Sequence, residues 1–163
     1  MKDNSLSDKQ LILFQYDYYN SAWGLQHNGF LIDNKGNVLT YDNPEGWNHQ
    51  DKLTEEQLIE NIQKCRISSS KVPAEDLHKY KNYIHNISSS KITAKRNVSY
   101  DAGTSRFICY QYSESTGTYV GYLIKMEGDY TSENLNFYSK KVTLWMRDIG
   151  IATGNNVISD FHR

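Results

Sequence analysis

Two pairs of apolar segments, each joined by a short turn sequence, constrain the fold of this chain most. Residues 28–33 and 37–42 flank Asn-Lys-Gly-Asn, whose residue types favour a tight reversal. Residues 105–112 and 118–127 flank a Ser-Thr-Gly turn in the same way. The sequence therefore predicts two β-hairpins.

A further strand precedes them. Residues 10–19 combine leucine, isoleucine and aromatic side chains too densely for a solvated helix face, which is typical of a central strand. Strands joined as hairpins, without regularly spaced crossover helices, favour an antiparallel sheet with helices on one side. We expect a single α+β domain over 1–163, with 1–9 as a polar leader and 150–163 as a tail that can be flexible.

Three segments have helical patterns. Thr54 and Gln57 have the spacing of a capping box, and they begin a helix that we expect to bury Leu58, Ile59, Ile62 and Cys65. A second helix is predicted over about 74–87, after Pro73, and a third over about 132–148. Residues 88–104 are a connection with room for one short strand.

Charge and length exclude several classes of protein. The 163 residues are enough for one core, and a net charge of −1 gives no field that recruits nucleic acid. The acidic groups gather toward the start of the chain and the basic groups toward its middle, which is the ordinary pattern of two solvated faces. No apolar run is long enough for a transmembrane segment.

The first residues and the cysteines bear on the cellular compartment. The start of the chain lacks a secretory signal, which fits a cytoplasmic protein or a mature form. A polar leader before a strand favours the mature periplasmic or cell-surface form, with a lipid anchor outside the given chain. Cys65 and Cys109 leave two alternatives, one disulfide or two free thiols.

His27 is the candidate catalytic residue. It stands just before a predicted strand, and Gly29 beside it allows close approach of backbone. This pattern resembles the histidine strand of papain-like peptidases and their circularly permuted relatives, which implies a cysteine nucleophile such as Cys109. However, Cys65 falls at the end of a helix and Cys109 within a strand, whereas such a thiolate is stabilised at a helix N-terminus. Cysteine catalysis is therefore the alternative, and the leading expectation has no catalytic residue.

Metal and cofactor sites have no signature in the sequence. His49 and Asp51 lie in an irregular loop and, with His27, lack the spacing of metal ligands. The glycine-rich phosphate-binding motifs and the common hydrolase motifs are missing from the sequence. We therefore expect neither a metal nor a cofactor.

Aromatic density is the remaining functional feature. Tyrosine and tryptophan give rigid contact area with a polar tip, which suits a protein-binding surface. We expect an exposed group of them near Trp23, Trp47 and the loop between these two residues. The candidate binding residues are Trp23, Gln26, His27, Trp47, Tyr110 and Tyr112.

One stretch resembles a group of proteins. It has the pattern Tyr-x-Asn-x-Ala-Trp-Gly-x-Gln-His-x-Gly, formed by Tyr18, Asn20, Ala22, Trp23, Gly24, Gln26, His27 and Gly29. In this it resembles small uncharacterised bacterial lipoproteins and secreted proteins, which implies an envelope location. The leading hypothesis is a non-enzymatic bacterial binding protein, envelope-associated or an immunity protein that neutralises a toxin. The alternative is a His-dependent hydrolase centred on His27.

Overall fold

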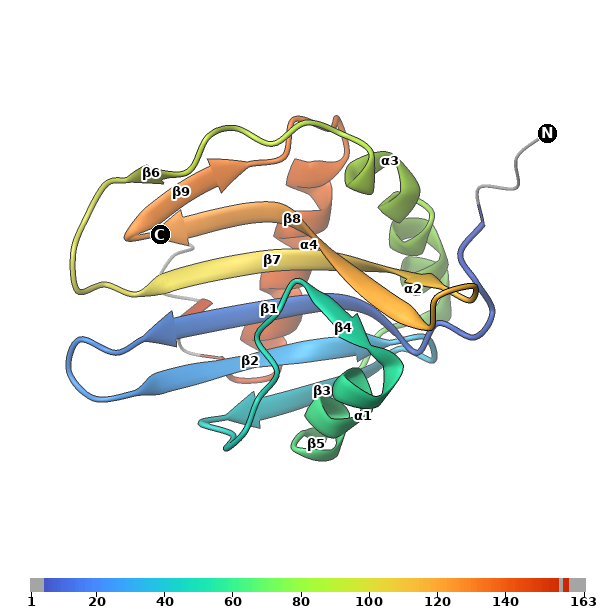
Figure 1. Cartoon of the computed structure of the whole chain (residues 1–163), viewed down its shortest axis with the longest axis horizontal. Helices are drawn as coiled ribbons and strands as arrows, with labels where there is room; N and C mark the ends of the chain where they lie inside the picture. The colour runs from blue at the N-terminus through green and yellow to red at the C-terminus, as the bar shows by residue number, and fades with distance from the viewer. Residues whose placement is uncertain (1–4, 156, 159–163) are drawn as a thin grey trace.

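A computed structural model describes residues 5–155 and 157–158, which form a single α+β domain (Figure 1). In these residues the strands are β1 (Ile12–Asn20), β2 (Gln26–Asp33), β3 (Asn37–Asp42), β4 (Lys52–Thr54), β5 (Arg66–Lys71), β6 (Arg96–Asn97), β7 (Thr104–Ser113), β8 (Thr118–Gly128) and β9 (Tyr130–Glu133). The helices are α1 (Glu55–Gln63), α2 (Ala74–Lys81), α3 (Ile84–Ser88) and α4 (Ser139–Ala152). The expected fold class is confirmed.

The strands pair antiparallel in the order β5-β3-β2-β1-β7-β8-β9-β6, and β4 pairs with the first part of β8. Both predicted hairpins are present, as β2–β3 and β7–β8. The predicted N-terminal strand is β1, and it joins the two hairpins by pairing with β2 on one side and β7 on the other. The expectation of a central strand is therefore confirmed.

The sheet separates two cores because side chains alternate between its faces. On the first face, Tyr16 and Phe107 pack with Ile84 of α3 and with Trp145 and Met146 of α4. The core of the second face gathers Leu31, Tyr41, Leu53, Leu58, Ile108 and Tyr119. Leu58 belongs to α1, so this helix covers the second face. The expectation that the helices share one side is wrong for α1.

The helix that follows Thr54 begins as predicted but buries a different set of residues. The Thr54 hydroxyl accepts a hydrogen bond from the Gln57 N–H at 3.1 Å, and the Gln57 side chain accepts one from the Thr54 N–H at 2.9 Å. Leu58 is buried as expected, but Ile59 is exposed and Asn61 is buried instead. Asn61 is satisfied by polar partners, which periodicity of apolar residues cannot reveal.

Three other expectations differ from the structure. The helix predicted over 74–87 divides into α2 and α3. The last helix begins at 139 and not 132, because 130–133 pair with β8 as strand β9. Residues 66–71, for which the sequence predicted no strand, pair with β3 as the edge strand β5. Strand pairing supplies backbone partners that outweigh local propensity in β5 and β9.

The expected leader and tail are only partly described. Leu6 packs against the first core, and Gly150 belongs to α4. Ile158 is fully buried, and its side chain fills the space beside Gly150. The first residues of the expected tail therefore belong to α4, and Ile158 belongs to the first core. Residues 1–4, 156 and 159–163 lie outside the described residues. No helix in the described part of the chain is long and apolar enough to cross a membrane.

Candidate functional site

A strap, residues 43–51, crosses the second face of the sheet between β3 and β4 (Figure 1). At its start, the Asn43 side chain accepts a hydrogen bond from the His27 N–H at 2.7 Å, and the Asn43 N–H donates to the His27 carbonyl at 2.6 Å. At its end, the Gly121 N–H donates to the Asp51 carbonyl at 2.7 Å. The strap therefore connects the first hairpin to the second.

Two side chains hold the middle of the strap. The Trp47 indole packs on the Tyr41 ring with centroids 4.2 Å apart. Asn48 and Asn61 of α1 bond reciprocally, because the Asn48 N–H donates to the Asn61 side chain at 2.9 Å and the Asn61 amide donates to the Asn48 carbonyl at 3.1 Å. Through these contacts, polar groups in the middle of the strap have hydrogen-bond partners within the protein.

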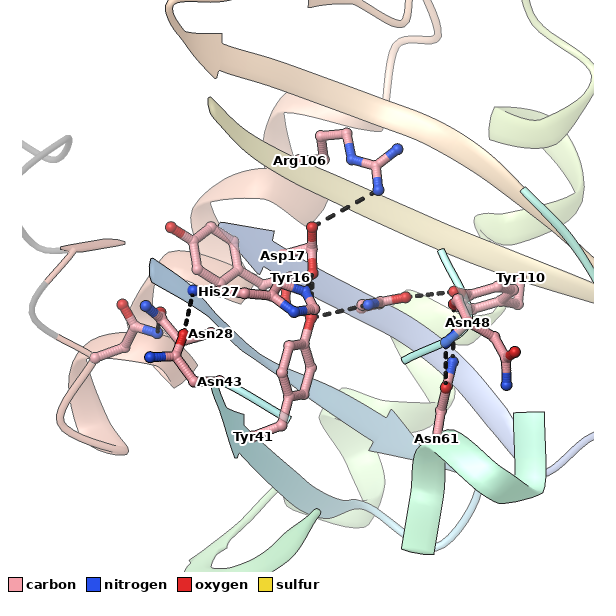
Figure 2. A network of polar contacts seen from close by, with 12 residues as sticks. Tyr16, Asp17, His27, Asn28, Tyr41, Asn43, Asn48, Asn61, Arg106 and Tyr110 are labelled. Carbon is pink, nitrogen blue, oxygen red and sulfur yellow. Dashed lines mark hydrogen bonds and ion pairs between the residues drawn. The ribbon is translucent and has the colours of Figure 1, made fainter. Parts of the chain in front are cut away.

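Beneath the strap lies a buried carboxylate with three polar neighbours (Figure 2). One oxygen of Asp17 accepts hydrogen bonds from His27 Nε2 at 2.8 Å and from the Tyr41 hydroxyl at 2.6 Å. Its other oxygen faces the Arg106 guanidinium at 3.6 Å. Asp17 and His27 are both almost fully buried. The carboxylate is thus compensated by hydrogen bonds and by a cation, as a buried charge requires.

The network continues along the sheet. The Gln15 amide donates to the Tyr41 hydroxyl at 2.9 Å, and the Tyr110 hydroxyl donates to the Gln15 side-chain oxygen. Tyr41 belongs to β3 and Tyr110 to β7, so a chain of polar side chains spans four neighbouring strands. Such a network is stable only when each of its members is satisfied.

The lack of a side chain at Gly29 leaves room for the Tyr41 hydroxyl. A Cβ atom at this position would lie 2.6 Å from the Tyr41 hydroxyl oxygen and 1.9 Å from the Tyr16 carbonyl oxygen. Any side chain there would therefore displace the tyrosine or the neighbouring strand. The glycine noticed in the sequence beside His27 serves the approach of Tyr41 to Asp17.

The protonation states in this cluster follow from burial and charge. Burial alone would raise the pKa of Asp17, but the hydrogen bond and charge of His27, together with Arg106 and Tyr41, offset it and lower the pKa below its usual value. Burial, and then the Asp17 charge, raise the pKa of Tyr41 well above its ordinary value. Asp17 is therefore an acceptor and Tyr41 a donor at neutral pH.

A small hollow opens between the strap and the sheet beside this cluster. It measures about 220 Å³, and its lining includes Gln15, His49, Asp51, Arg106, Tyr110 and Tyr122. The His49 and His27 ring centroids are 5.0 Å apart. Burial, and then repulsion by His27, lower the pKa of His49. Among the described residues, no three His, Cys, Asp or Glu side chains group closely enough to hold a metal ion.

The structure brings together only some of the predicted binding residues. Trp47 belongs to the strap, the His27 ring lies 5.7 Å from the Trp47 ring, and Tyr110 lines the hollow beside the strap. The expectation that Trp47 is exposed is wrong: it is only 8% exposed, because its ring stacks on Tyr41. Trp23 and Gln26 are exposed at the β1–β2 end. Tyr112 lies apart, with its hydroxyl 3.3 Å from a Glu55 carboxylate oxygen.

The two cysteines lie in different cores and are free thiols. Cys109 packs in the core of the first face, and Cys65 contacts that of the second face. The structure therefore does not bring Cys109 to His27, which belongs to the second face. Burial raises the pKa of each thiol to about 12. Of the two alternatives for the cysteines, the structure has the free thiols.

Sequence reasoning missed Asp17, Tyr41 and Arg106 as parts of this site. Asp17 had one available signal, a lone carboxylate inside a strand whose other residues are uncharged and mostly apolar or aromatic. A charge at a buried strand position requires partners. Their identity depends on which strands are neighbours, and β7 follows β1 by more than 80 residues in the chain.

A second surface lies at one end of the sheet, where the β1–β2 turn meets the connection before β7 and the β8–β9 turn (left in Figure 1). We call it the aromatic end. It comprises the exposed side chains Tyr19, Trp23, Leu25, Tyr100 and Tyr130. Tyr19, Tyr100 and Tyr130 line a common groove there together with Ala22, the neighbour of Trp23.

Comparison with known proteins finds no family model, no curated protein and no solved structure that matches this chain.

Proposed function

We propose that this chain is a non-enzymatic binding protein whose protein partner docks on the aromatic end. The observation that supports the proposal is the exposure of Trp23 and Tyr100, at 82% and 83%, on the same end of the sheet. Large aromatic side chains left in water carry an unfavourable hydration free energy, which a partner relieves. Tryptophan and tyrosine are also the residues that most often dominate binding energy.

The partner classes that we propose are a toxin that this chain neutralises or a protein of the bacterial envelope. The resemblance of residues 18–29 to lipoproteins and secreted proteins supports the envelope, and with it a periplasmic or cell-surface location. Trp23 lies within that resembling stretch and also on the aromatic end. The same residues therefore support both the location and the binding surface.

The experiment compares partner capture by three forms of the protein. The double variant Trp23→Ser/Tyr100→Ser removes the two most exposed aromatics, and Phe137→Ser removes a 78% exposed aromatic outside the aromatic end. We expect one protein at near-stoichiometric yield with the wild type and with Phe137→Ser, and at least a tenfold loss with the double variant. Equal capture by all three forms would contradict the proposed docking surface. Failure of the wild type to capture any partner at near-stoichiometric yield would contradict the proposed function.

The second candidate is a His-dependent hydrolase centred on His27. One observation favours it: Asp17 orients the imidazole through Nε2, and Nδ1 has no hydrogen-bond partner among the described residues. A carboxylate that orients a histidine is the arrangement used for general-base catalysis. Because Cys109 belongs to the other face, this candidate activates a water molecule and not a thiol.

The two candidates are separated by hydrolysis assays on a panel of amides and esters. An enzyme centred on His27 loses at least a hundredfold in rate in His27→Gln and nothing in His78→Gln, which changes an exposed histidine. A binding protein shows no turnover above background in the wild type, in His27→Gln or in His78→Gln. Circular dichroism of His27→Gln separates loss of chemistry from loss of fold.

A further inference from the structure

Helix α4 crosses behind the sheet in Figure 1, and one of its sides faces away from the sheet. Val142, Trp145 and Met146 belong to the first core and are buried. On the outer side, Leu144 and Ile151 are 45% and 43% exposed. A helix that carries large apolar residues on its outer side as well as toward the core has a second surface to bury.

Five exposed side chains form one line along this outer side, which we call the α4 stripe. Its members are Phe137, Lys141, Leu144, Asp148 and Ile151. Successive members are three or four residues apart, which keeps them on the same side of a helix. Phe137 precedes α4, but its ring centroid lies 5.8 Å from Lys141 Nζ, so the ring lies beside the first turn. The stripe shares no residue with the strap or the aromatic end, and an inference about it is independent of the proposed function.

The order of these residues makes the stripe complementary to itself. Leu144 lies in the middle, with Phe137 and Ile151 seven residues to either side. Lys141 lies three residues before Leu144, and Asp148 four residues after it. If a second α4 lies antiparallel to the first with the two Leu144 side chains opposed, Lys141 of each copy meets Asp148 of the other. Phe137 then meets Ile151, and a two-fold axis through the centre repeats every contact.

The charges select this antiparallel arrangement. Among the described residues, neither Lys141 nor Asp148 forms an ion pair. Oppositely charged side chains of one helix meet at a spacing of three or four residues, whereas these two are seven apart. A parallel arrangement would place Lys141 against Lys141 and Asp148 against Asp148, and like charges in an interface are unfavourable. Only the antiparallel pair gives both charges a partner.

We propose that the α4 stripe binds a second copy of this chain, as an antiparallel pair of helices in a two-fold symmetric dimer. The 14 residues of α4 measure about 21 Å, so the contact is at the small end of specific interfaces. The dimer is therefore weak, with a Kd on the order of 10–100 µM. Phe137, Leu144 and Ile151 supply the apolar area, and the charge pairs set the orientation.

Sedimentation velocity over a range of protein concentrations around that Kd tests the proposal. We expect the wild type to change from monomer to dimer. Reversing one charge, in Lys141→Asp or in Asp148→Lys, opposes like charges in both symmetry-related contacts and should weaken dimerisation at least about tenfold. The double variant Lys141→Asp/Asp148→Lys opposes unlike charges again and should return to within about threefold of the wild type. Lys35→Asp, the same charge change at an exposed residue of the β2–β3 turn, should leave the Kd unchanged.

A mixture of the two single variants separates the ion pairs from any effect on folding. In Lys141→Asp both charged positions of the stripe are acidic, and in Asp148→Lys both are basic. We expect an equimolar mixture to form a heterodimer at concentrations at which each variant alone is a monomer. Recovery in the mixture also shows that both variants are folded, because an unfolded chain has no stripe to pair.

Leu144→Gln tests the apolar centre of the contact. It should weaken dimerisation about tenfold, since the two copies of this residue face each other, and circular dichroism should show unchanged helix content. Trp23→Ser/Tyr100→Ser, which changes only the aromatic end, should dimerise like the wild type. The dimer and the proposed function can therefore fail separately.

Three outcomes overturn the proposal. A wild type that stays monomeric at concentrations at least about tenfold above the expected Kd would leave the stripe for a different protein. A dimer that tolerates both single charge reversals would lie on another surface. Single variants that lose the dimer, but that neither the double reversal nor the mixture restores, would show that Lys141 and Asp148 do not meet.

Discussion

The hydroxyl of Tyr41 reaches across the backbone of Gly29 and donates to the carboxylate of Asp17, 2.6 Å away. Three strands meet in this contact, since Tyr41 belongs to β3, Gly29 to β2 and Asp17 to β1. The pairing of the three strands therefore brings the Tyr41 hydroxyl to Asp17, and this hydrogen bond in turn helps to keep Asp17 ionised.

Gly29→Ala tests the steric part of this contact. The added methyl group overlaps the Tyr16 carbonyl and the Tyr41 hydroxyl, so we expect a loss of at least about 3 kcal/mol in the free energy of unfolding. Urea denaturation measures it. Gly117→Asn is the control, because nothing lies within 4 Å of that position and asparagine tolerates its positive φ of 65°. A smaller loss in unfolding free energy for Gly29→Ala than for Gly117→Asn would contradict the close contact of Tyr41 and Tyr16 with Gly29.

Asp17→Asn tests the electrostatic part. The variant leaves His27 and Arg106 without their carboxylate, so we expect it to cost about 2–4 kcal/mol of unfolding free energy at pH 7. The folded-state pKa of Asp17 is lowered, so its stabilisation is present above the unfolded pKa and is lost as pH falls through the folded pKa. The difference between wild type and variant should shrink below about pH 4.

That experiment consists of urea unfolding curves for both proteins between pH 7 and pH 2.5. A difference that stays constant over this range would show that Asp17 titrates alike in the folded and unfolded chains. Glu114→Gln, at an exposed carboxylate in the β7–β8 turn, is the control, for which we expect little change at any pH.

His49 predicts that stability also depends on pH at mildly acidic values, above the range in which Asp17 titrates. Burial and the neighbouring His27 lower its pKa, so the unfolded chain binds its proton more readily than the folded protein does. Stability should therefore fall as pH drops below about 6.5, and His49→Gln should lessen that fall. NMR titration of the imidazole protons measures the pKa directly, and a value at or above 6.5 would contradict the position of the His49 ring beside that of His27.

The cysteines predict chemical inertness. Burial raises both thiol pKa values to about 12, and Cys65 and Cys109 lie in cores on opposite faces of the sheet. We expect the native protein to react with iodoacetamide at pH 8 at least about tenfold more slowly than the urea-unfolded chain. Mass spectrometry reads both rates. A Cys65–Cys109 disulfide after mild oxidation of the native protein would refute the two-core arrangement.

Sequence patterns correctly predicted the elements that depend on interactions between residues close together in the chain. The hairpin turns, the strand limits at Asn37 and Asp42 and the capping box at Thr54 are each defined by a few adjacent residues. Strands β5 and β9 were not predicted, because their backbone partners come from distant segments. The site follows the same division: His27 was noticed from its neighbours in sequence, whereas Arg106 meets Asp17 only through the pairing of β1 with β7.

The central position of β1 has a consequence for how the chain is made. Its partner β7 ends only at Ser113, so a growing chain on the ribosome holds the most apolar strand with one edge unpaired until two thirds of the protein has been synthesised. Pairing across such a distance is slow, and an open apolar edge invites association with other chains. Expression at low temperature or with chaperones should therefore raise the yield more than any substitution on the finished surface.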